Sequence, residues 1–369
     1  MNPKRYHLLD AVRGLAALDV LVFHSHYVKG LWLGVQVFFV VSGYCIASAT
    51  DSALGRGLSI GTFMRRRVRR IAPPYLASVA FALALGITGL LVARPGGSSP
   101  FTFTVAEILQ NATLTQWLTL TRAWLAGHPF PSAPDNPILL VGSYWSLCYE
   151  EQFYLLAGLV LVCSRRMHPA LVTTAVVLGL GAVGLVHPTR VTGLLTDYWL
   201  QFSCGIVLYL RLCRVRTPGL GRAIDLALGI AAPAFYALGR LRGEHIFESH
   251  GLAFLSQLGF CCGVAFVLSL LRTWDEGLSS TPPIRALRTV GAFSYSLYLV
   301  HQPVLGVTLR LHQGLPQALV SGLGVAYSIS AAYLFHRIFE RPFLNEPLAP
   351  QPAPAQLVGT TLSVDLARP

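Results

Sequence analysis

The sequence is poor in charged residues and lacks the motifs of the common soluble enzymes. Only 12% of its 369 residues are charged, whereas about 25% are charged in a typical soluble protein. It contains no HExxH zinc helix, GxSxG elbow or P-loop, and no histidine begins an HxxxD or HxxxxD acyl-transfer motif. These absences argue against the corresponding sites, and the low charge indicates that lipid is the main solvent of the chain.

The cysteines and the net charge argue against two further classes of site. The seven cysteines lie mostly in apolar segments and form no CxxC pair, so we expect small buried side chains rather than disulfides or metal ligands. The formal net charge of +12 comes from arginines in short segments between apolar runs, which is the pattern of a membrane protein rather than of a nucleic-acid-binding surface. We therefore expect no bound metal and no nucleic acid, and the lipid bilayer is the expected partner.

Apolar segments long enough to cross a bilayer recur along the chain. Hydrophobic residues make up 53% of the sequence, in blocks of roughly 18 to 22 residues that match a hydrocarbon core of about 30 Å. They predict an all-α, polytopic integral membrane protein of about ten transmembrane helices, near residues 8–28, 31–49, 72–93, 142–163, 169–187, 194–211, 223–240, 251–271, 289–310 and 316–336. Ten spans leave most Lys and Arg residues on the side of the N-terminus, so both termini and the 50–71 loop are predicted to be cytoplasmic.

Two segments lie outside these spans. Residues 94–141 form a long segment on the predicted outer side, and their stretch TFTVAEILQNATLTQWL is expected to be an interfacial or re-entrant helix. The segment is either a lid over an outward-facing site or a linker. Residues 348–369 lack periodicity and are expected to be a disordered cytoplasmic tail, which makes residues 1–347 the transmembrane domain.

The first predicted span carries ionisable side chains, which are costly in a membrane and therefore mark candidate functional sites. Arg13 and His24 are eleven residues apart, which brings them within about 20° on one helix face and about 16 Å along the axis. The alternative is that neighbouring helices satisfy both side chains and that neither takes part in a reaction. Asp19 points away from this face, and the sequence indicates no partner for it.

The fourth and ninth spans carry further polar residues. Glu150 and Glu151 point about 100° apart, so one faces a site and the other pairs with a cation. A carboxylate can hold an imidazole in one tautomer, and we therefore hypothesise a pair of His24 with Glu150. In the ninth span, Tyr298 and His301 belong to a polar face that either lines a site or joins helices by hydrogen bonds.

The densest run of charge is FMRRRVRRIAPPY, on the predicted cytoplasmic side. Arg66, Arg67 and Arg70 can clamp the phosphates of a cofactor by paired hydrogen bonds, and Pro73 and Pro74 are expected to fix where the next helix begins. The alternative is that the arginines only set the orientation of the chain in the membrane.

Six segments, in this order, resemble the membrane-bound acyltransferase 3 family, whose bacterial members O-acylate polysaccharides, peptidoglycan, lipochitooligosaccharides and macrolides. The segments are LDAVRGLAALDVLVFH, VQVFFVVSGYCIA, RRVRRIAPPY, YWSLCYEEQFYLL, SYSLYLVH and FERPF, within about residues 6–343. The resemblance implies a multi-pass protein of the bacterial plasma (inner) membrane. It also implies specific site residues, of which the catalytic ones are Arg13, His24 and Glu150, the cofactor-binding ones Arg66, Arg67 and Arg70, and those lining the substrate site or tunnel Trp145, Ser146, Tyr295 and His301.

The resulting hypothesis is transfer of an acyl group, expected to be acetyl, from acyl-coenzyme A to a sugar hydroxyl of a polysaccharide or glycoconjugate. His24 is expected to act as the base, Glu150 to orient it, and Arg13 to act electrostatically. An acylated His24 that relays the group across the bilayer is a chemical variant. The alternative function is a transporter of a lipid-linked sugar or an acyl group, with the charged spans lining its path.

Overall fold

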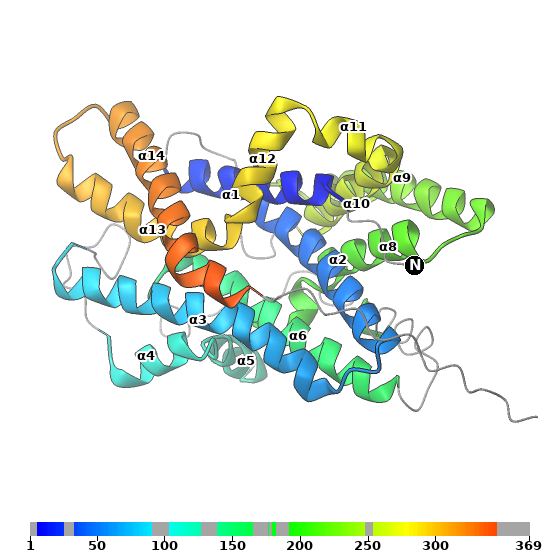
Figure 1. Ribbon diagram of the computed structural model, residues 1–369, viewed down its shortest axis with the longest axis horizontal. Helices are drawn as coiled ribbons and strands as arrows, with labels where there is room; N and C mark the ends of the chain where they lie inside the picture. The colour runs from blue at the N-terminus through cyan, green and yellow to red at the C-terminus, as the bar shows by residue number, and fades with distance from the viewer. Residues whose placement is uncertain are drawn as a thin grey trace, which may run out of the picture.

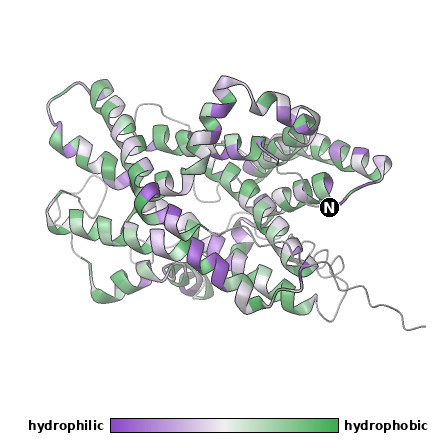
Figure 2. Ribbon diagram, viewed as in Figure 1, coloured by the Kyte–Doolittle hydropathy of each residue, from purple (hydrophilic) through white to green (hydrophobic). Residues whose placement is uncertain are grey.

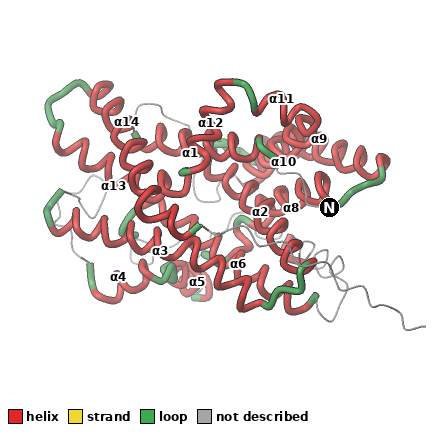
Figure 3. Tube along the Cα trace, in the orientation of Figure 1, coloured by secondary structure: helices red, strands yellow, loops and turns green. Residues whose placement is uncertain are grey.

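The computed structural model describes residues 6–25, 33–90, 103–126, 139–164, 176, 179–181, 192–247 and 254–344. Within these ranges every regular element is helical, which confirms the all-α prediction (Figure 3). The predicted fifth span, 169–187, lies mostly outside the described residues. The predicted tail, 348–369, lies wholly outside them.

Six helical segments of the described chain are long and apolar enough to cross a membrane. They are Gly34–Gly55 (α2), Ile60–Ile87 (α3), Gly142–Cys163 (η2, Gly142–Tyr144, with α6, Trp145–Cys163), Pro218–Leu241 (α9), Phe254–Ser279 (α10, Phe254–Leu270, η4, Leu271–Trp274, and α11, Asp275–Ser279) and Gln317–Phe343 (α14, Gln317–Phe335, η5, His336–Glu340, and η6, Arg341–Phe343). The chain is thus a multi-pass membrane protein, and hydrophobic residues recur along its helices (Figure 2).

Three further helices fall on predicted spans but are shorter. They are α1 (Leu8–His24), α8 (Trp199–Cys213, after η3, Leu195–Asp197) and α13 (Ser294–Leu311). The 15 residues of α8 rise only about 22 Å, less than the hydrocarbon core. The total of ten spans and the cytoplasmic position of both termini therefore stay predictions.

The helix α3 differs most from the sequence prediction. It begins at Ile60, where the Oγ of Ser59 accepts a hydrogen bond from the amide of Thr62 (3.1 Å), and it continues without a break through Pro73 and Pro74. The expectation that these prolines start the helix is wrong. The arginine run instead forms the first half of α3, which packs against α6 and α13 (Figure 1).

The predicted outer segment also differs from its expectation. It contains two short helices, α4 (Val105–Ala112) and α5 (Trp117–Leu125), where one interfacial helix was expected. The helix α4 begins with a capping box, in which the side chains of Thr104 and Glu107 each bond the other residue's amide. The chain is not helical from 113 to 116, so the two helices are separate.

An additional helix, α12 (Pro282–Ala292), packs along α1 (Figure 1). A Cβ atom on Gly14 would lie 2.0 Å from the carbonyl oxygen of Leu287, and one on Gly291 would lie 1.9 Å from that of Asp10. Only glycine allows the two backbones to approach so closely. This contact fixes α1 against α12, and α1 also packs against α2 and α13. The packing positions His24 at the end of α1.

Candidate functional site

The imidazoles of His24 and His301 lie against each other. His24 is the last residue of α1 and is half-buried, whereas His301, in the middle of α13, is 1% exposed. The Nε2 atom of His301 lies 3.3 Å from the Nδ1 atom of His24, and the ring centroids are 5.0 Å apart. Two residues of the predicted site, 277 positions apart in the chain, therefore meet at one place.

The backbone indicates the tautomer of both rings. The Nδ1 atom of His24 lies 2.8 Å from the carbonyl oxygen of Val20, and that of His301 lies 3.0 and 2.9 Å from the carbonyl oxygens of Leu297 and Tyr298. A carbonyl oxygen only accepts hydrogen bonds, so each Nδ1 carries the proton. In the neutral form the lone pair of His24 is therefore on Nε2, the atom suited to take a proton from an acceptor hydroxyl.

Two hydroxyl groups beside His301 join α6 to α13. The phenol of Tyr298 donates to the carbonyl oxygen of Ser143 (2.5 Å), so its oxygen accepts from the hydroxyl of Ser146, 2.6 Å away. The ring of Tyr298 lies 5.9 Å from that of His301. Ser146 thus lies in the same polar cluster as the histidines, although its hydrogen bond connects helices.

Glu150 contacts a different set of groups. Its Oε1 atom accepts hydrogen bonds from the Ser42 hydroxyl on α2 (3.2 Å) and from the Tyr154 phenol one turn along α6 (3.0 Å). The predicted contact of Glu150 with His24 is thus replaced by the contact of His301 with His24. The physical reason is that packing turns Glu150 toward α2, which no pattern in the sequence of α6 encodes.

The three arginines predicted to bind phosphate share the inner face of α3. Arg66, Arg67 and Arg70 are half-buried, whereas Arg65 and Arg69 are exposed. The guanidinium of Arg67 lies 5.6 Å from the ring centroids of both Phe63 and Tyr154. Within the described part of the chain its Nε atom is buried and has no hydrogen-bond partner. Arg67 also connects the arginine face, through Tyr154, to Glu150.

Two aromatic residues of the predicted site have structural contacts. Trp145 packs edge-on against Phe39 and close to Tyr198, in the aromatic core between α2, α6 and η3. The phenol of Tyr295 donates to the carbonyl oxygen of Ile71 (3.2 Å), just before the two prolines of α3. Tyr295 therefore ties α13 to the helix that carries the arginines.

Arg13 and Asp19 lie on α1 with His24 but in different surroundings. Among the hydrogen bonds and ion pairs of the described residues, none involves the half-buried Arg13 side chain. Asp19, which lacked a partner in the sequence, accepts a hydrogen bond from the amide of Gly34 (2.7 Å), the first residue of α2. A carboxylate there satisfies an unpaired amide and the positive end of the helix dipole. Asp19 thus caps α2.

Ser42 and Tyr154 did not stand out as site residues in the sequence. Tyr154 lies four residues after Glu150, the spacing of side chains that contact on a helix, so this signal was present. Ser42 is one hydroxyl in an apolar helix, and such residues are common at helix contacts. Only the packing of α2 against α6 indicates its role.

The chain matches the family model described as an acyltransferase domain over residues 6–337. It is 25% identical over 370 residues to the peptidoglycan O-acetyltransferase OatA of Listeria monocytogenes, covering 90% of this chain and 55% of that protein. It is 27% identical over 305 residues to the provisionally named membrane-bound transacylase BcsY of Komagataeibacter xylinus, covering 80% and 72% of the two chains.

A third relative is the O-acetyltransferase OatA of Staphylococcus aureus, 27% identical over 191 residues that make up 50% of this chain and 30% of that protein. The chain thus spans only about half of the Listeria relative and less of the Staphylococcus one. No solved structure matches it.

Proposed function

Because this chain belongs to the acyltransferase family whose domain it matches over residues 6–337, we propose that it transfers an acetyl group from acetyl-coenzyme A to a sugar hydroxyl. The acceptor class is a polysaccharide or glycoconjugate of the bacterial envelope, and peptidoglycan is the first candidate because the Listeria relative is named for it. The observation that carries the proposal is the contact between His24 and His301, in which Nδ1 of His24 carries the proton and the basic lone pair is on Nε2.

The chemistry needs a base for the acceptor, since a thioester is already activated. The Nε2 atom of His24 removes the proton as the sugar oxygen attacks the thioester carbonyl. The tetrahedral intermediate collapses, the carbon–sulfur bond breaks, and the proton passes to the departing thiolate. His301 holds the ring of His24, because its Nε2 atom accepts from the Nδ1–H group of His24 and stabilises the imidazolium.

The donor is assigned to the arginine face of α3. Arg66, Arg67 and Arg70 carry three positive charges on one half-buried face, and guanidinium groups form paired hydrogen bonds with phosphate oxygens. Glu150 positions Tyr154, against which Arg67 packs. Glu150 therefore acts on donor placement in this proposal, and Arg13 supplies positive potential along α1.

The test is incubation of the purified protein with radiolabelled acetyl-coenzyme A and candidate glycans, peptidoglycan fragments included. Label in the glycan supports the enzyme. The same protein in sealed vesicles distinguishes the relay and transport alternatives. A stable acetyl-histidine supports relay through His24, and movement of an unreacted lipid-linked sugar without glycan labelling contradicts the proposal in favour of a transporter.

A further inference from the structure

The two short helices of the predicted outer segment belong to the helical packing, because α4 packs against α3 (Figure 1). The phenol of Tyr75, near the middle of α3, donates to the carbonyl oxygen of Asn111 on α4. The hydroxyl of Thr121 on α5 donates to the carbonyl oxygen of Thr192 (3.0 Å). The turn between the two helices contains Leu114, which is buried. Irregular backbone at membrane depth is tolerated only inside a protein, so this arrangement is that of a re-entrant segment.

The side chain of Asn111 connects α4 to the segment that precedes α6. It is completely buried, and its Nδ2 atom donates to the carbonyl oxygen of Glu107, one turn earlier on α4 (2.8 Å). Its Oδ1 atom accepts from the backbone amide of Leu140, 29 residues further along the chain (2.8 Å). Only a side-chain amide offers a donor and an acceptor in this geometry. Asn111 therefore fixes the place where the chain returns from the outer segment toward α6.

The segment that begins at Leu140 leads into η2, which contacts α13 beside His301. The backbone amide of Ser143 donates to the Oε1 atom of Gln302 (2.9 Å), and its carbonyl oxygen accepts from the phenol of Tyr298 (2.5 Å). Gln302 directly follows His301 in α13, and Tyr298 precedes it by one turn. Two backbone groups of one residue thus hold α13 on both sides of the buried imidazole.

The connection from Leu140 to η2 is short and tightly packed. Leu140 is 5% exposed, and only two residues separate it from Ser143. The phenol oxygen of Tyr144 lies 2.7 Å from the hydroxyl oxygen of Ser78, which anchors η2 to α3. A close-packed interior transmits displacements because it has little free volume to absorb them. A shift at Leu140 therefore reaches the contacts of Ser143 with α13.

We propose that Asn111 is a positioning residue for the imidazole pair. Asn111 fixes Leu140 at the start of the segment, and the segment then holds α13 on both sides of His301. The inference rests on the proposed function, in which His301 holds the ring of His24 while a sugar hydroxyl loses its proton. It also gives the predicted outer segment a role, since α4 supports the site instead of only linking two spans.

The kinetic test compares Asn111→Ala with Thr113→Ala. Asn111→Ala should lower kcat about tenfold and leave the donor KM unchanged, because a small displacement of a positioned base slows the reaction. The hydroxyl of Thr113 bonds the carbonyl oxygen of Leu109 at the same end of α4 (2.8 Å), and its other contacts stay within α4 and the turn. Thr113→Ala should therefore change neither constant. An unchanged kcat for Asn111→Ala, or an equal fall for Thr113→Ala, would overturn the assignment.

A double-mutant cycle tests the path from Asn111 to α13. Gln302→Leu removes the acceptor of the Ser143 amide and keeps a side chain of similar size. If Asn111 acts through this segment, the two effects on kcat should not multiply. The double variant Asn111→Ala/Gln302→Leu should then be about as slow as the slower single variant. Effects that multiply would show that Asn111 acts elsewhere and would contradict the proposal.

Chemical modification tests the positioning without any acetyl transfer. His301 is 1% exposed, so diethyl pyrocarbonate should modify it slowly in the native protein. Asn111→Ala should raise the modification rate of His301 several-fold, as measured by mass spectrometry, and leave that of His336 at the native value. An unchanged rate at His301, or an equal rise at both histidines, would rule out a local effect on the imidazole pair.

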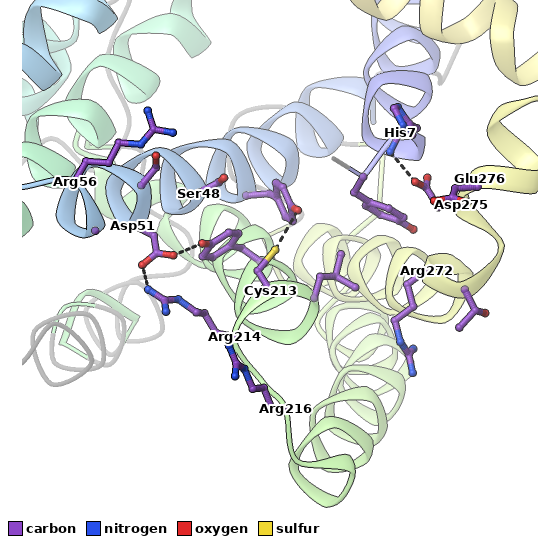
Figure 4. A pocket seen from close by; sticks show the side chains of 17 residues that line it. His7, Ser48, Asp51, Arg56, Cys213, Arg214, Arg216, Arg272, Asp275 and Glu276 are labelled. Atoms are coloured by element: carbon purple, nitrogen blue, oxygen red, sulfur yellow. Dashed lines mark hydrogen bonds and ion pairs between the residues drawn. The ribbon is translucent and has the colours of Figure 1, made fainter. Parts of the chain in front are cut away.

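Asp51→Ala controls for helix packing that is loosened at a different place. Asp51 accepts hydrogen bonds from Tyr209 and Arg214 in a cavity of about 1020 Å³ at the ends of α2 and α8 (Figure 4). The lining of that cavity includes neither Asn111 nor any residue of η2. Asp51→Ala should lower the Tm and leave the modification rate of His301 at the native value. If it exposed His301 as much as Asn111→Ala does, Asn111 would affect stability alone and the proposal would be wrong.

Discussion

His24 and His301 are held by their own helices in the same way: the Nδ1 atom of each lies within 3.0 Å of the carbonyl oxygen four residues earlier, at Val20 and Leu297. Each ring is thereby fixed in rotation and tautomer before any substrate binds. The 3.3 Å contact between them is consequently directed, with Nδ1–H of His24 facing the lone pair of His301.

His24→Ala should leave the protein folded and able to bind donor, yet slow transfer by about 10²–10⁴-fold, the range for loss of a general base. His24→Gln should be nearly as slow, because an amide forms hydrogen bonds but takes no proton at neutral pH. Single-turnover transfer and donor binding measure the two effects separately. Rapid transfer by a well-folded His24→Ala protein would rule out both the base and the relay mechanisms.

His301→Ala should lower kcat less than His24→Ala does and leave the donor KM unchanged, because His301 acts through the imidazole of His24. The double variant His24→Ala/His301→Ala should then be no slower than His24→Ala alone. Tyr298→Phe is the matched control, since it alters the same polar cluster without touching the imidazole pair. A double variant much slower than either single variant would show that His301 contacts substrate directly.

Glu150→Gln should slow transfer less than His24→Ala does. The effects of the two substitutions on the free energy of activation should add, because Glu150 contacts Ser42 and Tyr154 rather than His24. Tyr154→Phe removes one of the same hydrogen bonds and should shift donor KM in the same direction. Transfer rates of the single and double variants, measured at several donor concentrations, test whether Glu150 acts independently of His24. Strong non-additivity between Glu150 and His24 would instead restore the imidazole–carboxylate pair expected from the sequence.

Arg67→Ala/Arg70→Ala should raise donor KM more than acceptor KM, whereas Arg65→Ala/Arg69→Ala should have little effect on either. Both double variants remove two positive charges from one helix, but only the first pair is half-buried beside α6. Lysine at 67 and 70 should rescue only partly, since an ammonium lacks the paired donors of a guanidinium. If both double variants changed donor KM equally and both inserted wrongly into the membrane, the arginines would only set the orientation of the chain.

Asp19→Ala should lower the free energy of unfolding by about 1 kcal/mol, the usual cost of losing a helix cap. Asp19→Asn should retain most of the stability, because an amide oxygen can also accept the hydrogen bond. The Tm of the purified protein in detergent measures this change. Donor KM should stay at the native value, because the carboxylate bonds the Gly34 amide and lies away from the arginine face. A large loss of donor affinity without a lower Tm would show that Asp19 belongs to the site.

The sequence by itself determined the class of the molecule and most of its candidate residues. A bilayer requires long apolar segments and makes ionisable side chains costly within them, so both the helices and residues such as His24 and Glu150 are visible in the chain. The charge run also singled out Arg66, Arg67 and Arg70, although it was assigned to a loop, and the structure places these residues half-buried on α3.

Only the tertiary structure decided which polar residues meet. A helical wheel gives the angles between side chains of one helix, but the rotation of that helix against its neighbours depends on packing. The close contact of Gly14 and Gly291 orients α1, and His24 then faces His301, with Glu150 turned toward Ser42. For the same reason Asp19 found its partner only in the fold, since the amide it caps belongs to another helix.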